Sequence, residues 1–241
     1  LRAESRRYFL GYFWWILEPL LYVLVFYMVF EKLLQGRKSD YLAFLMVGKL
    51  TFVWFSKSVS QAGNSFEANK GLMAQLNLPK ALFPLSVTLE GVYRQVPVFG
   101  FLFIFLIGNG FDPNVQWFWL LPLILIQGML IIGCGLASAL LVCLQRDFKF
   151  LIQLGMVFLL FMSGIFWDIK DIRDDQLLNC LLILNPLATL VDAFRQVLMH
   201  GTAPDLTRIC WVLLQSLLLV FAMCFLYSRL QFWIANRVLS R

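Results

Sequence analysis

The chain has little charge and few of the residues on which enzyme active sites depend. Charged residues make up 14% of its 241 residues, where about 25% is usual, and His200 is the one histidine. The five cysteines form no Cys-x-x-Cys pair and show no metal-ligand spacing. A Gly-x-x-x-x-Gly-Lys-Ser/Thr phosphate-binding loop is absent, and no two carboxylates share an apolar segment. We therefore expect no catalytic residues, no metal site and no cofactor bound by this chain itself.

Apolar residues dominate the composition instead. Hydrophobic residues reach 61% and aromatic residues 16%, and the mean hydropathy is +0.78. A soluble protein of this size cannot bury so much apolar surface, whereas a lipid bilayer solvates it. The net charge of +6 does not indicate a nucleic-acid partner, because no basic run exceeds two residues and the charges lie between apolar blocks. The composition predicts an integral membrane protein.

The apolar blocks are long enough to cross a bilayer, because a membrane-spanning α-helix needs about 20 apolar residues. No internal repeat or low-complexity segment divides the chain, so residues 1–241 are expected to form one all-α membrane domain. Six spans are predicted, at about residues 12–34, 41–62, 83–107, 117–144, 150–166 and 209–227.

The segments between the predicted spans carry unequal numbers of basic residues. With both termini placed inside, the inner segments hold ten Lys and Arg and the outer segments hold seven. Basic residues gather in cytoplasmic loops, and an even number of spans puts both termini on one side. The distribution therefore favours cytoplasmic N- and C-termini.

Two segments outside the spans have a distinctive pattern. Residues about 64–78 predict a short amphipathic helix whose apolar ridge has no core of its own to fill, so it either lies on the bilayer or docks into a partner. Residues about 177–199 are apolar but broken at Asn185-Pro186. That break predicts a re-entrant hairpin, which enters the membrane from one side and whose irregular backbone is covered by protein.

Charged residues inside the spans are candidates for a transport path. Lys49 and Lys57 lie eight residues apart on the second span and share a helix face. Lys57 can extend toward the cytoplasmic interface, whereas Lys49 lies deeper and is expected to face a polar cavity or an acid on another helix. Glu90 and Arg94, at i and i+4 on the third span, are expected to neutralise each other.

The first span opens with an unusual run of aromatic residues, GYFWWILEP at 11–19. Tyr12, Trp14 and Trp15 are typical of an interfacial aromatic belt. The same rings also suit the apolar face of a sugar ring, so the run has a second interpretation as a platform for stacking glycans.

These segments together resemble the permease subunits of ABC exporters for cell-surface polysaccharides, a family that includes the capsule, O-antigen and teichoic-acid export permeases. The resemblance covers essentially the whole chain, with capsule-like segments beside an O-antigen-like RDFKF at 146–150. The matching segments are the Gly-Tyr-x-Trp-x-x-x-x-Pro-like opening at 11–19, FEANKGL at 66–72, Arg146-Asp147 after the fourth span, and Asn185-Pro186 with Phe194-Arg195 in the outer hairpin.

The resemblance implies a homodimer whose translocation path lies between the two copies. Two copies of a separate ABC ATP-binding subunit would bind ATP and Mg and drive the transport of a lipid-linked polysaccharide across the bacterial inner membrane. It assigns coupling to the ATPase to Glu67, Asn69, Lys70, Gly71, Leu72, Arg146 and Asp147. It assigns the glycan path or its mouth to Tyr12, Trp14, Trp15, Glu18, Lys49 and Trp54, and the re-entrant hairpin to Asn185, Pro186, Asp192 and Arg195.

Two other functions are weighed against this one. A permease of an ABC drug or small-lipid exporter would have a related architecture. A membrane enzyme acting on lipid-linked sugars would need paired carboxylates or His/Arg clusters at one membrane depth, and the sequence offers none.

Overall fold

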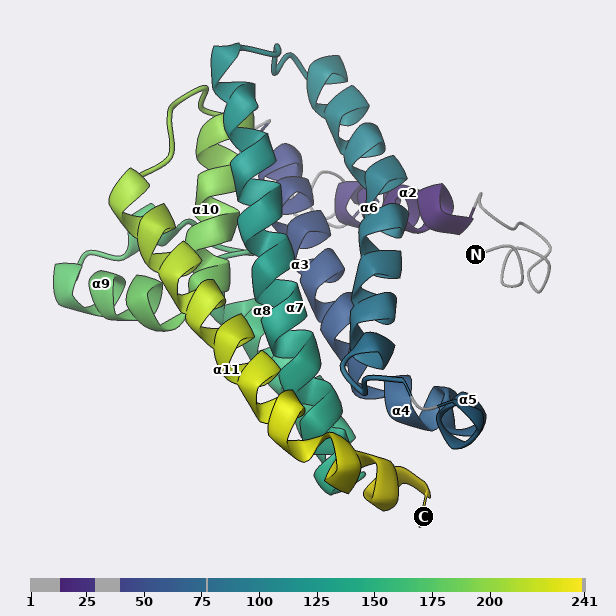
Figure 1. The fold of residues 1–241 in the computed structure, drawn as a ribbon. Coiled ribbons are helices and arrows are strands. Elements are labelled where there is room, and N and C mark those ends of the chain that lie inside the picture. Colours follow the sequence, from purple (N-terminus) through teal and green to yellow (C-terminus); the bar gives the residue numbers. More distant parts are fainter. Residues whose placement is uncertain (1–13, 29–39, 77, 240–241) are drawn as a thin grey trace.

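The computed structural model describes residues 14–28, 40–76 and 78–239, and every regular element in that part of the chain is a helix (Figure 1). The predicted all-α class is confirmed for these residues. The elements are α2 (Trp14–Tyr27), α3 (Tyr41–Gly63), α4 (Ser65–Ala68), α5 (Lys70–Gln75), α6 (Leu82–Gly108), η3 (Val115–Trp119), α7 (Leu120–Leu144), α8 (Phe148–Met162), η4 (Ile169–Asp171), α9 (Asp175–Leu184), α10 (Pro186–Leu198) and α11 (Leu206–Leu239).

Four helical segments of the described chain are long and apolar enough to cross a membrane. They are α3, α6, the continuous η3–α7 segment and α11. A fifth span results if α9 and α10, which are bent by 104° at their junction, are counted as one. The predicted count of six is therefore not confirmed, and the first predicted span, 12–34, is described only over α2.

The predicted spans 150–166 and 209–227 differ from the helices found there. Helix α8 has 15 residues, which at 1.5 Å per residue gives about 22 Å, short of a hydrocarbon layer of about 30 Å. It ends at Met162, and Ser163 caps it just before Gly164, whose φ of +67° lies in the left-handed region. Helix α11 has 34 residues and, at about 51 Å, extends beyond the apolar stretch that marked the predicted span.

The long helices form a bundle with two central and two outer members. Helix α7 packs against α3 on one side and α11 on the other, and α6 packs against α3 (Figure 1). In the most apolar window, 67% of α3 but only 17% of α11 is buried. Helices α3 and α7 are therefore the centre, and α6 and α11 present apolar side chains outward, as a lipid-facing surface requires.

Small residues allow this close packing. A Cβ placed on Gly133 would lie 2.9 Å from Leu219 on α11, and one on Gly135 would lie 2.9 Å from Thr88 on α6. The small residues of α7 thus serve helix contacts within the chain, as close approach in a membrane demands.

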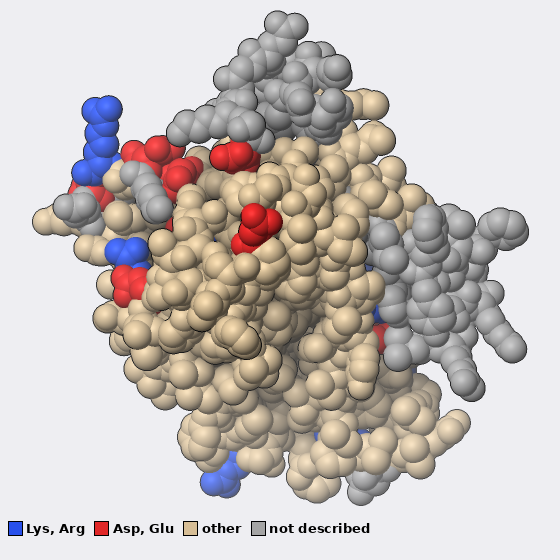
Figure 2. Space-filling model, turned by 90° about the horizontal axis from the view of Figure 1, so that it is seen from above, with Lys and Arg blue, Asp and Glu red and all other residues tan. Residues whose placement is uncertain are grey.

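The two ends of the bundle differ in construction. Helices α4 and α5 lie at the same end as the described part of the C-terminus, whereas the connection between α6 and α7 lies at the opposite end (Figure 1). We call these the α4–α5 end and the α6–α7 end. Figure 2 looks onto the α6–α7 end, where uncharged residues cover most of the visible face and acidic side chains gather on one part of it.

Candidate functional site

The predicted helix at about 64–78 is divided into two short helices, α4 and α5, which meet at Asn69. The Asn69 backbone leaves the helical region at φ −113° and ψ 20°, and its Nδ2 donates to the Ser65 carbonyl oxygen at 2.8 Å. Because this side chain bonds a carbonyl oxygen of α4 in place of a continuing helix turn, the chain turns and restarts as α5. Asn69 therefore shapes the segment.

The α4–α5 segment is anchored by two apolar side chains and exposes two others. Phe66 is buried between Phe83 of α6 and Tyr227 of α11, with ring centroids 6.3 and 6.4 Å away, and Met73 is also buried. Leu72 and Leu76 remain 43% and 47% exposed. The apolar ridge predicted from the sequence is thus split between the core of this end and an outward surface.

An ion pair joins this segment to the connection between α7 and α8. Arg146 Nε lies 2.6 Å from Glu67 Oε1, and the two side chains are 62% and 46% exposed. Two of the predicted coupling residues, which are far apart in the sequence, therefore meet at one place. An ion pair this exposed contributes about 0.2–1 kcal/mol, so it orients the two connections more than it stabilises the fold.

A cavity of about 340 Å³ opens beside this ion pair. Its wall combines the end of α3, the α4–α5 segment, the end of α7 and the last turn of α11, with Lys70 and Arg146 as its cationic members. The lining residues are Gly63, Phe66, Glu67, Lys70, Val142, Cys143, Arg146 and Val238.

Two other predicted coupling residues, Asp147 and Gly71, make few contacts within this chain. Asp147 precedes α8 and accepts a hydrogen bond from Gln145 Nε2 at 3.3 Å. Gly71 is exposed, and a Cβ placed on it would meet no atom within 4 Å. Close packing inside this chain therefore does not explain a glycine at position 71.

Helix α11 fastens the α4–α5 end in a way the sequence did not indicate. The Tyr227 hydroxyl donates to the Leu136 carbonyl oxygen at 3.0 Å, and Arg237 Nη2 donates to the Leu144 carbonyl oxygen at 3.3 Å. Both acceptors belong to α7. No local sequence pattern relates Arg237 to a carbonyl 93 residues earlier.

The predicted break at Asn185-Pro186 is the junction of α9 and α10. The Asn185 Oδ1 accepts from the backbone N–H groups of Leu187 and Ala188, which caps α10, and Pro186 is its first residue. Asn185 Nδ2 donates to the Met162 carbonyl oxygen and to Ser163 Oγ at the end of α8. One amide therefore caps α10 and ties it to α8.

Arg195 is the most enclosed charged residue of this region, with 2% of its surface exposed. Its guanidinium donates to the carbonyl oxygens of Phe44, Gly164 and Ile165 at 2.7–3.3 Å. The guanidinium carbon also lies 3.3 Å from the centroid of the Phe44 ring. Arg195 therefore joins α10 to the start of α3 and to the segment after α8.

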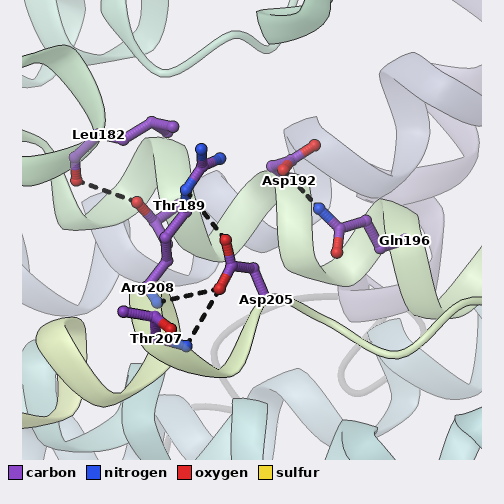
Figure 3. A network of polar contacts seen from close by, with 7 residues as sticks. All are labelled: Leu182, Thr189, Asp192, Gln196, Asp205, Thr207 and Arg208. Carbon is purple, nitrogen blue, oxygen red and sulfur yellow. Dashed lines mark hydrogen bonds and ion pairs between the residues drawn. The ribbon is translucent and has the colours of Figure 1, made fainter. Parts of the chain in front are cut away.

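Polar contacts continue around the bend and into the start of α11 (Figure 3). Thr189 Oγ1 donates to the Leu182 carbonyl oxygen at 3.0 Å, across the bend. Gln196 Nε2 donates to Asp192 Oδ2 at 2.7 Å along α10. Asp205, at the start of α11, accepts from the backbone N–H groups of Thr207 and Arg208 and pairs with the Arg208 side chain at 3.2 Å.

The residues predicted to line a glycan path are only partly described. Tyr12 lies outside the described residues, and for Trp14, Trp15 and Glu18 only the backbone, within α2, is described. Lys49 lies with its Nζ 5.4 Å from the centroid of the Tyr22 ring on α2. Trp54 is buried in the bundle against Phe99, so within this chain it lines no accessible surface.

The described residues contain no candidate metal centre. Within residues 14–28, 40–76 and 78–239, no three His, Cys, Asp or Glu side chains are grouped so that they could hold a metal ion.

This fold is that of an integral membrane protein with several helical spans, and comparison with known proteins identifies its family. The profile of the ABC-2 type transporter family matches residues 2–199. The chain belongs to the ABC-2 type transporter family, and the resemblance drawn from its motifs is confirmed at this level.

The relatives of the chain include export permeases. It is 28% identical over 206 residues to the O-antigen export system permease protein RfbA of Klebsiella pneumoniae, which covers 84% of this chain and 78% of that protein. It is 22% identical over 222 residues to RfbA of Myxococcus xanthus, covering 92% and 85%. It is 24% identical over 234 residues to the polysialic acid transport protein KpsM of Escherichia coli, covering 94% and 88%.

Proposed function

We propose that the chain is the permease subunit of a bacterial ABC exporter that moves lipid-linked polysaccharide of the O-antigen or capsule type across the inner membrane. It acts as a homodimer with two copies of a separate ATP-binding subunit, which supplies ATP hydrolysis and its Mg. Support comes from the relatives, which are named as O-antigen export system permease proteins and a polysialic acid transport protein. The absence of a phosphate-binding loop in the sequence agrees with a separate motor.

The observation that carries the proposal is the Glu67–Arg146 ion pair beside the exposed Leu72 and Leu76. Two connections far apart in the sequence form one surface, on which apolar side chains stand next to charged ones. Such a surface suits docking to another protein. Movement of a docked ATPase would pass to α3, α7 and α11 as a rigid-body displacement, with Asn69, Lys70, Gly71 and Asp147 as further coupling residues.

The topology follows from this assignment. The α4–α5 end is cytoplasmic, and both termini lie on that side, in agreement with the excess of basic residues in the predicted inner segments. Helices α9 and α10 then form the re-entrant hairpin on the outer side, with Asn185 and Pro186 at its bend and Asp192 and Arg195 on its second helix.

The chemistry of the substrate explains the need for such a path. Each desolvated hydroxyl costs several kcal/mol in hydrocarbon, so a polysaccharide crosses only along a polar or aromatic route. Tyr12, Trp14 and Trp15, with Glu18, are proposed to stand at the cytoplasmic mouth, where sugar rings stack weakly on aromatic faces.

Deleting the gene in its native host tests the function directly. Surface polysaccharide should be lost while lipid-linked polymer accumulates on the inner side of the membrane, and the wild-type gene should restore export. Unchanged surface polysaccharide would contradict the proposal. ATPase stimulation of the purified complex by small amphiphiles and not by glycans would favour the drug or small-lipid exporter.

A matched pair of variants tests the docking surface. Leu72→Asp should reduce copurification of the ATP-binding subunit and export by about tenfold, because a buried interface would then hold an unpaired charge. Leu82→Asp changes a similarly exposed leucine (46%) at the start of α6 and serves as the control. Equal behaviour of the two variants would remove the coupling assignment.

A further inference from the structure

The cavity beside the Glu67–Arg146 ion pair has a wall with two different parts. One part carries charge, with Lys70 and Arg146 as cations and Glu67 as an anion. The other part is apolar and is made by Phe66, Val142, Cys143 and Val238. At about 340 Å³ the cavity falls within the range of small-molecule sites, about 300–1,000 Å³. Such a wall fits a ligand that has both an anionic group and an apolar part.

The charges of this wall leave one cation in excess. Arg146 Nε pairs with Glu67 Oε1 at 2.6 Å, whereas Lys70 forms no hydrogen bond or ion pair with any described residue. A guanidinium carries five N–H groups, so Arg146 can donate to a second anion while its Nε serves Glu67. The cavity therefore has a net positive charge and donors for an anionic group.

Exposed apolar side chains on both sides of Arg146 indicate its depth in the membrane. Leu141 and Leu144, in the last turn of α7, are exposed. Phe150 and Leu151, in the first turn of α8, are exposed as well. Apolar side chains at the ends of two membrane helices lie in the apolar layer, whether they face lipid or a second copy of the chain. The connection that carries Arg146 therefore lies directly beyond that layer, among the headgroups.

Helix α11 passes the same boundary. Phe232 and Trp233 are exposed near its end, and tryptophan is enriched where hydrocarbon meets the headgroups. Val238, which lines the cavity, follows Trp233 by five residues, or about 7.5 Å along the helix. Because α11 is tilted relative to α7 (Figure 1), the depth along the bilayer normal is smaller, and a headgroup layer is about 5–7 Å deep. The cavity thus lies level with the lipid phosphates.

We propose that this cavity binds the phosphate of an anionic glycerophospholipid of the inner leaflet. The phosphate lies between the Lys70 ammonium and the Arg146 guanidinium, and the glycerol and first methylene groups lie on the apolar part of the wall. Basic side chains near the headgroups attract anionic lipids, and a guanidinium matches the oxygens of a phosphate. The choice of leaflet rests on the proposed topology, whereas the site itself does not.

The apolar part of the wall favours a lipid over a soluble anion. A free phosphate, or an acidic side chain of the ATP-binding subunit, would neutralise the charge but leave that part of the wall uncovered. The glycerol and methylene groups of a lipid cover it. Leu72 and Leu76, the side chains proposed to dock the ATP-binding subunit, do not line the cavity. The docking surface and the lipid site are therefore separate.

A bound phosphate would strengthen the joint beside the cavity. Lys70 belongs to α5, and Arg146 belongs to the connection between α7 and α8. Their segments are otherwise joined by an exposed ion pair, which contributes little. A phosphate that accepts hydrogen bonds from both sides bridges them. Anionic lipid thus regulates the joint through which, under the proposed function, the ATPase moves the bundle.

Native mass spectrometry of the complex with its ATP-binding subunit measures the bound lipid. The complex is released from nanodiscs that contain phosphatidylglycerol and phosphatidylcholine, and the wild type should retain the first in preference to the second. Lys70→Gln should lower the retained phosphatidylglycerol about fivefold, the effect of one basic residue near an anionic lipid surface. Lys70→Arg should keep it. Arg146→Gln should lower it at least as much, because the Glu67 carboxylate then faces the phosphate without its partner.

Lys149→Gln is the matched control. It removes the same charge from an exposed lysine at the start of α8 that does not line the cavity, so retention should stay close to that of the wild type. Equal losses in Lys70→Gln and Lys149→Gln would overturn the inference, because the attraction would then belong to the surface as a whole.

Two further arms identify the source of the anion. Glycerol phosphate is added to the complex in nanodiscs of phosphatidylcholine alone, and thermal unfolding is measured. Stabilisation equal to that given by phosphatidylglycerol would overturn the inference in favour of a soluble phosphate. Retention of phosphatidylglycerol by the permease alone, but not by the complex, would also overturn it, since the partner would then fill the cavity. Loss of export on gene deletion is compatible with each of these outcomes, so the proposed function is tested separately.

Discussion

Two joints of the molecule, one beside the α4–α5 segment and one at the bend between α9 and α10, are made by different kinds of polar contact. The α4–α5 segment is joined to the connection between α7 and α8 by an exposed ion pair between two side chains, Glu67 and Arg146. At the bend between α9 and α10 the joining contacts are buried, and Arg195 and Asn185 reach backbone carbonyl oxygens of other segments. Exposed charges separate at little cost, whereas a buried guanidinium cannot lose its acceptors cheaply. The bend is therefore a fixed element, and the joint between the α4–α5 segment and the α7–α8 connection is an adjustable one.

The largest effect should come from Arg195→Leu. This change leaves the carbonyl oxygens of Phe44, Gly164 and Ile165 without their donor, and buried acceptors without a partner cost about 1–3 kcal/mol each. We expect a loss of about 3 kcal/mol or more in stability, measured as thermal unfolding of the detergent-solubilised protein. The control is Arg208→Leu, which removes an exposed i,i+3 pair and should change stability by less than about 1 kcal/mol.

A conservative variant sharpens this test. Lys carries the charge but presents a single point donor group instead of a planar fork. Arg195→Lys should therefore recover only part of the lost stability. Equal stability of Arg195→Leu and Arg208→Leu would show that the bend is no more firmly held than the exposed surface.

A smaller effect is expected from Asn185→Ala. Loss of a helix N-cap costs about 0.5–2 kcal/mol, and Asn185 also bonds Met162 and Ser163 at the end of α8. Asp205→Ala provides the comparison, because Asp205 caps α11 at an exposed site. Thermal unfolding should show the greater loss for Asn185→Ala, and a greater loss for Asp205→Ala would contradict the tie to α8.

The smallest effect on stability should come from Glu67→Lys or Arg146→Glu. Their exposed pair contributes about 0.2–1 kcal/mol, so unfolding should change little while export and ATPase stimulation fall. The double variant Glu67→Lys/Arg146→Glu restores an opposite-charge pair and should recover part of the export. Failure of the double variant to exceed either single variant would show that the two positions act separately.

Much of the fold follows from local sequence. The apolar blocks at 41–62, 83–107 and 117–144 predicted α3, α6 and α7 to within a few residues, because about 20 apolar residues in sequence are enough to mark a span. The lengths of α8 and α11 were predicted less well. A turn at Ser163-Gly164 ends α8 early, and polar residues after Tyr227 continue α11 without a local sign of its end.

The sequence predicted which residues belong to the candidate sites, but not which of them contact one another. The FEANKGL segment and Arg146-Asp147 were both identified, yet nothing in the sequence related Glu67 to Arg146. The Asn185-Pro186 pair predicted the break between α9 and α10, because asparagine and proline are typical of a helix start. Arg195 was placed in the hairpin, but its acceptors, up to 151 residues away, were not predictable.

The sequence by itself determined that the chain is helical, apolar enough to lie in a bilayer and broken at Asn185-Pro186, because hydropathy and capping act between residues a few positions apart. Only the tertiary structure decided which loops contact one another, which carbonyl oxygens accept hydrogen bonds from Arg195 and which side chains of α3 stay accessible. Those outcomes depend on how long helices pack side by side, which brings together residues that no local pattern relates.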